Sequence, residues 1–285
     1  MPQALESIIR FPVSTWNGRA LFPKTLKRSW QRFGKDRVTI HTLEPDWPAP
    51  KGIRAASTLR GPVYSQGAYR GLNLGTHVGD NPETVARNRE HLAKSLRLRQ
   101  APAWLDQVHG IRCIEAQPGV RSEADASYTR DAEVPCIVMT ADCLPVLFAT
   151  RDGSAVGAAH AGWKGLAGGV LEATLEALGT TEVLAWMGPA IGPESFEVGP
   201  EVRKAFLERH PDADDAFNKT AKDRYHADLY RLARLILTQA GIAPESIFGG
   251  GRCTYRESDD FYSYRRDRTT GRMATLIWRE EQQDS

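Results

Sequence analysis

Short apolar runs that alternate with helical patterns constrain the fold of this chain more than any other feature. Several of these runs are apolar at consecutive positions, which is typical of strands that are buried on both faces. The predicted strands are Ile111–Ala116, Val134–Thr140, Leu144–Ala149, Ala155–Ala159, Val183–Met187 and Met273–Ile277. Because the runs and helical patterns alternate without a second linker, the sequence favours one α/β or α+β domain over two independent ones.

Four helices are predicted from apolar residues at helical spacing. Asp80 or Asn81 caps the first helix, with Pro82 in its first turn. The apolar stripes of the other three run from Leu166 to Leu178, from Val202 to Leu207 and from Leu229 to Ile236. Gly179 and Gly241 follow two of these stripes and predict helix ends, since glycine readily adopts the left-handed conformation found there.

The composition excludes several classes of protein. With 285 residues, 41% hydrophobic and 25% charged, the chain has ordinary globular usage. The four cysteines are widely spaced without a Cys-x-x-Cys pair, which argues against a disulfide scaffold and predicts reduced thiols. No apolar stretch approaches the ~18 residues that span a bilayer, and no signal-peptide core is present. We therefore expect a soluble, cytoplasmic protein with no membrane association.

A basic N-terminal extension is predicted for residues 1–44, followed by a catalytic domain over residues 45–285. Residues 1–44 contain eight Lys/Arg and three acidic residues, a balance of +5, which leaves −3 of the total charge of +2 for the remainder. Trp47–Pro50 cannot sustain a helix and marks the junction. Because the main body is not basic, nucleic-acid binding is not expected. The alternative for the extension is contact with an acidic partner, as in a non-catalytic binding or scaffold protein.

Polar residues stand at the ends of the predicted buried strands. His109 precedes the first strand, Asp142 and Cys143 lie between the second and third, and His160 follows the fourth. Zinc accepts two imidazoles and one thiolate, and such a set leaves a fourth position for water or substrate. Alternatively, the histidines are hydrogen-bonded core residues and the cysteine is a small apolar side chain. The separations of 34 and 17 residues match no compact metal motif, so the residues alone leave both readings open.

Three further motifs carry groups that suit a nucleoside or phosphate. The glycine-bracketed run 157–165 lets a backbone approach a ligand closely, or forms a tight strand-to-helix turn. Arg265 and Arg266 offer guanidinium forks beside aromatic rings, or belong to a solvated turn. Asn73 and His77 orient a sugar, or cap the turn before the first helix.

Six ordered motifs carry a resemblance to a known family. They are Asn-Leu-Gly-x-His-x-Gly-Asp at 73–80, Gln-Val-His-Gly at 107–110, Thr-Ala-Asp-Cys-Leu-Pro at 140–145, His-Ala-Gly-Trp at 160–163, Gly-Pro-Ala-Ile-Gly-Pro at 188–193, and Ser-Tyr-Arg-Arg-Asp with Thr-Gly-Arg-Met within 263–273. From about Trp47 to Trp278, the chain resembles the family variously named laccase-domain, multicopper polyphenol oxidase or purine nucleoside phosphorylase proteins. Residues 1–44 lie outside this resemblance.

The resemblance implies a fold, a metal site and an activity. The fold is an α/β layered sandwich, an α+β arrangement in which mixed sheets pack between helices. His109, Cys143 and His160 are the implied ligands of a metal in a surface cleft, zinc in the first place and copper as an alternative. The implied activities are phosphorolysis of adenosine, inosine, guanosine and methylthioadenosine, and deamination of adenosine, with purine nucleosides and phosphate as small-molecule partners.

Roles for individual residues follow from this implied chemistry. Arg265, Arg266 and Arg60 are candidate clamps for phosphate, and Asp142 carries a proton or orients a ligand histidine. Lys164 stands where the family commonly has an arginine, so it keeps the charge but loses the bidentate fork. Pro62 and Val63 replace a glycine pair of the family, which predicts a stiffer loop there.

Two other activities remain open at this level. One is a copper-dependent polyphenol oxidase of the laccase type, although seven histidines without a His-x-His pair cannot build a multicopper cluster. The other is a thiol hydrolase, such as an amidase that edits peptidoglycan precursors, with Cys143 as nucleophile and His160 or His109 as base.

Overall fold

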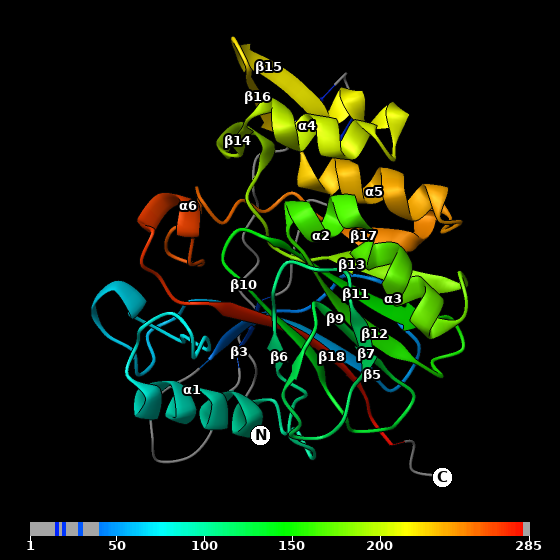
Figure 1. Ribbon diagram of the computed structural model, residues 1–285. Helices are drawn as coiled ribbons and strands as arrows, with labels where there is room; N and C mark the ends of the chain where they lie inside the picture. Colours follow the sequence, from blue (N-terminus) through cyan, green and yellow to red (C-terminus); the bar gives the residue numbers. More distant parts are fainter. Residues whose placement is uncertain (1–14, 17–18, 21–27, 31–39, 282–285) are drawn as a thin grey trace.

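Two β-sheets packed face to face form the centre of the molecule, and helices cover their outer faces (Figure 1). The computed structural model describes residues 15–16, 19–20, 28–30 and 40–281. Arg10, Lys24, Lys27, Arg32, Lys35 and Arg37 of the predicted basic extension lie outside the described residues. None of the helices in the described ranges combines the length and apolar character that a bilayer-spanning segment needs.

The first sheet has five strands that are antiparallel throughout. In spatial order they are β10 (Cys136–Thr140), β18 (Met273–Arg279), β5 (Ile53–Thr58), β4 (His41–Leu43) and β3 (Arg28–Trp30). The strand β4 lies within the stretch predicted as the extension, and its Leu43 is buried. The sheet therefore begins before residue 45.

The second sheet has six strands and is mixed. In spatial order they are β17 (Ile247–Gly249), β13 (Val183–Met187), β11 (Leu144–Thr150), β12 (Val156–Ala161), β9 (Ala126–Thr129) and β7 (Cys113–Glu115). The β13–β17 and β7–β9 pairs are parallel, and the other pairs are antiparallel.

The remaining strands form three smaller sheets. They are β14 (Glu197–Val198), β16 (Arg224–Ala227) and β15 (Phe217–Ala221); β6 (Leu105–Asp106) with β8 (Ser122–Glu123); and β1 (Thr15–Trp16) with β2 (Arg19–Ala20). The helices are α1 (Pro82–Ser95), α2 (Trp163–Gly168), α3 (Val170–Leu178), α4 (Pro200–Leu207), α5 (Leu229–Gln239) and α6 (Tyr264–Asp267). Single turns of 3-10 helix span Gly67–Tyr69, Pro193–Ser195 and Pro244–Ser246, and a longer one spans Pro211–Ala216.

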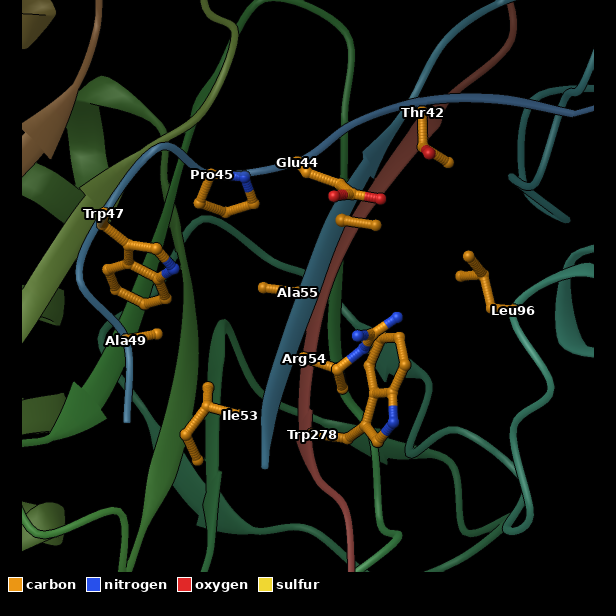
Figure 2. Close-up of a pocket in the computed structure, with 11 residues that line it drawn as sticks. Thr42, Glu44, Pro45, Trp47, Ala49, Ile53, Arg54, Ala55, Leu96 and Trp278 are labelled. Carbon is orange, nitrogen blue, oxygen red and sulfur yellow. The ribbon is translucent and has the colours of Figure 1, made fainter. Parts of the chain in front are cut away.

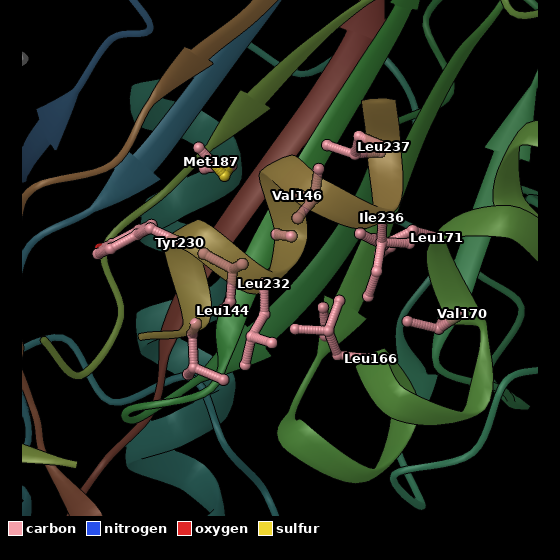
Figure 3. Close-up of a cluster of buried hydrophobic side chains, with 14 of the residues drawn as sticks. Leu144, Val146, Leu166, Val170, Leu171, Met187, Tyr230, Leu232, Ile236 and Leu237 are labelled. Atoms are coloured by element: carbon pink, nitrogen blue, oxygen red, sulfur yellow. The ribbon is translucent and has the colours of Figure 1, made fainter. Parts of the chain in front are cut away.

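Strand β10 shows why the strands are apolar on both faces. Successive side chains of a strand point to opposite faces, so Val138 packs between the two sheets while Ile137 packs toward helix α1. On the far side, Val146 of β11 faces Leu171 of α3 and Ile236 of α5 (Figure 3). The predicted single domain, with mixed sheets packed between helices, is confirmed.

The predicted helices all occur, with one difference. Asn81 caps α1 by accepting a hydrogen bond from the Thr84 backbone N–H at 2.9 Å, and Gly179 ends α3 in the left-handed conformation. The predicted helix that carries Leu166 and Leu178 is divided into α2 and α3, because Gly169 adopts φ +110°.

The predicted strands also occur, with shifted ends. The other strands are not predicted from the sequence, among them β4, β5, β9, β17 and the β14–β16 hairpins. One shift affects the site, because His160 lies inside β12 and the prediction that it follows this strand is wrong. The strand continues through this residue because the β11–β12 ladder extends from Ala149↔Val156 to Leu144↔Ala161. His160 is buried, with 3% of its surface exposed.

Tyr230 of α5 joins two segments that meet near the end of β10. Its buried hydroxyl accepts from the Ala190 backbone N–H at 2.8 Å and donates to the Arg252 carbonyl at 2.7 Å. Ile191, the next residue along, donates its backbone N–H to the Asp142 carbonyl at 2.9 Å. One buried phenol therefore fixes the backbone that supports the turn containing Asp142.

We expect Tyr230→Phe to lower the free energy of unfolding by about 1 to 3 kcal/mol, because the Ala190 N–H and the Arg252 carbonyl lose a buried partner. Urea denaturation followed by tryptophan fluorescence measures this change. The matched control is Tyr225→Phe, which keeps the ring contact with Phe217 and should stay within about 0.5 kcal/mol of the wild type. Equal effects of the two substitutions would contradict the assignment.

Candidate metal centre

The three predicted metal ligands converge on one point. His109 lies in the loop before β7, Cys143 in the turn between β10 and β11, and His160 in β12. Their potential ligand atoms all lie within 4.8 Å of one another. The β11–β12 register explains part of this convergence, since Pro145 pairs with His160 and so brings the start of β11 beside it.

The geometry of this centre fits a metal ion such as zinc. Cys143 Sγ lies 3.8 Å from His109 Nε2, and the two imidazole rings are 4.8 Å apart between centroids at an angle of 74°. Tetrahedral zinc, with ligands at about 2.0 to 2.3 Å, holds neighbouring ligand atoms roughly 3.3 to 3.8 Å apart, a range that includes the distance between Cys143 Sγ and His109 Nε2. His109 is exposed, Cys143 half-buried and His160 buried, so one side of the centre is open to solvent. That open side suits a water or substrate ligand.

The buried carboxylate of Asp125 holds both histidine segments. Its Oδ1 accepts from His160 Nδ1 at 2.8 Å and from the His109 backbone N–H at 2.9 Å, and its Oδ2 accepts from the Gly110 N–H at 2.7 Å. Because His160 Nδ1 carries the proton in this bond, Nε2 is left as the free donor for a metal. His109 has φ +62°, and the hydrogen bonds to Asp125 stabilise this uncommon backbone conformation.

The charges at the centre favour a thiolate. Burial alone would raise the pKa of Cys143, but the nearby His160 charge and a hydrogen bond with His109 lower it to about 6. Burial alone would lower the pKa of His160, but Cys143 and Asp125 raise it to about 9. These shifts favour a thiolate beside an imidazolium. A thiolate is the form that ligates metals, and binding releases the imidazolium proton.

Two further residues position the ligands. The side-chain amide of Gln107 pairs with the backbone of Met139, accepting at 2.7 Å and donating at 2.8 Å, which ties the His109 loop to the end of β10. At Gly162, an added Cβ would lie 2.9 Å from His109 Cδ2 and 3.0 Å from Cys143 Sγ. Only glycine therefore lets the two ligands approach here.

Asp142 and Arg265 lie next to the centre and to each other. Asp142 Oδ2 accepts from the Arg265 backbone N–H at 2.7 Å, and Oδ1 accepts from Thr254 Oγ1 at 2.6 Å. These bonds tie the turn that precedes Cys143 to the start of α6. The orientation of a ligand histidine, one of two roles predicted for Asp142, is performed by Asp125. The guanidinium of Arg265 donates to the Glu197 carbonyl at 2.9 Å and lies 5.3 Å from the centroid of the Phe196 ring.

Internal hydrogen bonds occupy three other predicted binding residues. All five N–H groups of Arg266 donate to protein oxygens, three carbonyls and the Asp267 carboxylate. Arg60 donates to the carbonyls of Arg70 and Ser258. Asn73 is completely buried, and its amide bonds to Asp80 and to two backbone N–H groups, which is the turn-capping alternative.

His77 and Lys164 are exposed and available to a ligand. Partial burial of the ring lowers the pKa of His77, and the positive charges of Arg272, Arg121 and Arg89 lower it further. Lys164 lies in the first turn of α2, with its ammonium 5.7 Å from the centroid of the Trp163 ring.

Sequence reasoning missed Asp125, Gln107, Gly162 and Arg272 as contributors. Asp125 lies between two alanines directly before strand β9, and this charge next to small apolar residues was the available signal. A separate hollow lies between the 42–49 segment and strands β5 and β18, lined by Trp47, Arg54 and Trp278 (Figure 2). Its lining contains none of the predicted site residues, so it is not part of the candidate centre.

Solved structures share this fold. A crystal structure of a Neisseria meningitidis protein is 50% identical, with a TM-score of 0.81, covering 84% of this chain and 99% of that chain. The crystal structure of YlmD from Geobacillus stearothermophilus is 32% identical, with a TM-score of 0.80, covering 88% of this chain and 100% of that chain.

Curated relatives and a family description agree with these structures. A purine nucleoside phosphorylase of Pseudomonas aeruginosa is 51% identical over 242 residues, covering 84% of this chain and 98% of the relative. The purine nucleoside phosphorylase YfiH of Escherichia coli is 51% identical over 240 residues, covering 83% and 98%. Residues 54–280 match the family described as multi-copper polyphenol oxidoreductase laccase. The chain belongs to this family, as the ordered sequence motifs predicted.

Proposed function

We propose that the protein is a metal-dependent purine nucleoside phosphorylase. The observation that carries this proposal is the convergence of His109, Cys143 and His160 in a chain whose relatives at 51% identity are named purine nucleoside phosphorylases. The proposed substrates are phosphate and adenosine, inosine, guanosine or methylthioadenosine, and the proposed side activity is deamination of adenosine. We assign the catalytic function to the domain that follows the basic extension.

Two reactions share the proposed centre. In phosphorolysis, a phosphate oxygen bonds to C1′ of the ribose while the C1′–N9 bond breaks, and the purine leaves with that electron pair and takes up a proton. In deamination, water adds at C6 of adenosine and ammonia leaves, which gives inosine. A bound zinc, or alternatively copper, would supply Lewis acidity that lowers the pKa of water and stabilises developing negative charge.

The chain contributes ligands, orientation and positive charge. His109, Cys143 and His160 hold the metal, and Asp125 fixes the ring of His160 through Nδ1. Asp142 would carry a proton beside Cys143, while its bonds to Thr254 and Arg265 keep this turn in place. Arg265, Lys164, His77 and Arg60 are the predicted residues with donors left for phosphate or ribose.

A second candidate function is hydrolysis with Cys143 as nucleophile. The pKa of about 6 favours it, because a thiolate beside an imidazolium is the reactive form of a catalytic cysteine. Polyphenol oxidation has less support. The described residues include all seven histidines, yet they contain a single group of at least three potential ligands, whereas a multicopper oxidase needs several.

We expect purified protein incubated with inosine to release hypoxanthine only when phosphate is present, with loss of the activity after chelation and recovery with zinc. Liquid chromatography of inosine and adenosine reactions measures this. No free base and no inosine under any condition would contradict the proposal. Amide hydrolysis that survives a chelator and is blocked by iodoacetamide would then support the thiol hydrolase.

Replacement of Cys143 by alanine is expected to abolish both phosphorolysis and deamination, because the centre loses its thiolate ligand. Metal content by mass spectrometry and product formation by chromatography measure the loss. The matched control is Cys113→Ala, which removes a thiol of strand β7 outside the centre and should keep both metal and activity. Retention of either reaction in the Cys143 variant would refute the metal mechanism.

For Asp125→Asn we expect a roughly 10- to 100-fold loss of zinc affinity, since the amide cannot accept all the N–H bonds that orient the two histidines. Competition with a chromophoric chelator measures the affinity, and thermal unfolding checks that the fold is kept. Asp131→Asn, an exposed aspartate at the other end of β9, is the control and should bind zinc as the wild type does. Wild-type affinity in a folded Asp125 variant would exclude this role.

A further inference from the structure

Arg272 has a position beside the candidate centre that comes from strand pairing. The β10–β18 register pairs Met273 with Thr140, so Arg272 continues β18 at the level of the turn that leads to Cys143. Its positive charge interacts with Cys143 and Asp142, and also with the hydroxyls of Tyr264 and Tyr69. No other residue of the 270–273 motif carries a charge.

The hydrogen bonds of Arg272 leave part of its guanidinium without a protein partner. Nη1 donates to the carbonyls of Thr270 and Gly271, at 3.1 and 3.0 Å. Among the described residues, no hydrogen bond is formed by Nε or Nη2 and no carboxylate forms an ion pair with this arginine. The Nε–Nη2 edge is the one that binds a planar or tetrahedral oxyanion through two parallel bonds.

The surrounding structure holds this arginine rigidly. The buried amide oxygen of Asn73 accepts the Arg272 backbone N–H at 2.9 Å, and the Arg272 carbonyl accepts the Leu74 N–H at 3.2 Å. The side-chain stem packs over Gly75, where an added Cβ would lie 2.8 Å from Arg272 Cγ. Asn73, for which the sequence predicts either orientation of a sugar or capping of a turn, thus holds the backbone of Arg272 in place.

Two other arginines near the centre lack this free edge. Arg266 has used all five N–H groups, and Arg60 donates its Nε to a backbone carbonyl. Within the described part of the chain, the guanidinium of Arg265 donates only through Nη1, to the Glu197 carbonyl, and it lies over the Phe196 ring. Partial burial of a guanidinium that has no bonded carboxylate costs desolvation free energy, and an anionic ligand offsets this cost.

We propose that Arg272 binds the phosphate co-substrate beside the metal centre, with Asn73 as its positioning residue. This proposal rests on the proposed phosphorylase function and names its anion subsite. Phosphate is tetrahedral and doubly charged near neutral pH, so it can accept two parallel bonds from the free guanidinium edge. The nucleoside would then lie with its C1′ facing that phosphate.

The test compares Arg272→Gln with the metal-loaded wild type. We expect the KM for phosphate to rise roughly 10- to 100-fold, while the KM for inosine and the phosphate-independent deamination of adenosine change less than about threefold. Arg272→Lys keeps the charge but loses the fork, and should fall between the two. The matched control Arg54→Gln removes one exposed charge that lines the separate hollow, and should leave the KM for phosphate unchanged.

Calorimetric titration of the same proteins with inorganic phosphate separates this proposal from the proposed function. Binding to the wild type and its loss in Arg272→Gln support the anion subsite even if no nucleoside is cleaved. Absence of phosphate binding to the wild type, an unchanged KM for phosphate in Arg272→Gln, or an equal loss of deamination would each overturn it. Metal content and thermal unfolding confirm that each variant is folded, and Arg272→Lys alone decides the question if Arg272→Gln does not fold.

Discussion

The candidate centre depends on one buried carboxylate. Asp125 is completely buried, and its two oxygens bind the His160 ring together with three consecutive backbone N–H groups, from Val108 to Gly110. These bonds stabilise the negative charge: burial raises the pKa of Asp125, but the bonds to His160 and to the backbone lower it below its usual value. The same bonds fix the tautomer of one ligand and the backbone of the other, so the stability of the loop and the geometry of the centre have a common cause.

The two packed sheets explain why distant residues meet at this carboxylate. Strand β10 belongs to the five-stranded sheet and β11 to the six-stranded one, so the turn that contains Asp142 and Cys143 crosses from one sheet to the other. Antiparallel pairing places β18 beside β10 and β12 beside β11, which brings Arg272 and His160 to the two sides of this turn. The cross-over point therefore gathers the thiolate, an imidazole and a guanidinium from rigid strands.

The arginines near the centre divide according to how their N–H groups are used. Arg266 is fully bonded and stabilises the segment around α6, whereas Arg272 keeps one edge free. These two arginines therefore differ in what they can offer a ligand, because a guanidinium whose five N–H groups all donate within the protein has no donor left. The residue type alone does not distinguish Arg266 from Arg272, but the hydrogen bonds that each side chain forms do.

The sequence by itself determined the layered α/β class and the helix ends at Asn81 and Gly179, because apolar periodicity and capping residues are local patterns. The residues alone left the role of His109, Cys143 and His160 open, and the family resemblance implied that they form one site. The sequence did not reveal Asp125 or the continuation of β12 through His160, since these depend on strand register and on hydrogen bonds across 35 residues of sequence. Only the tertiary structure decided which side chains form internal hydrogen bonds and which keep donors for a ligand. Burial and hydrogen-bond partners are set by packing between segments that are far apart in the chain.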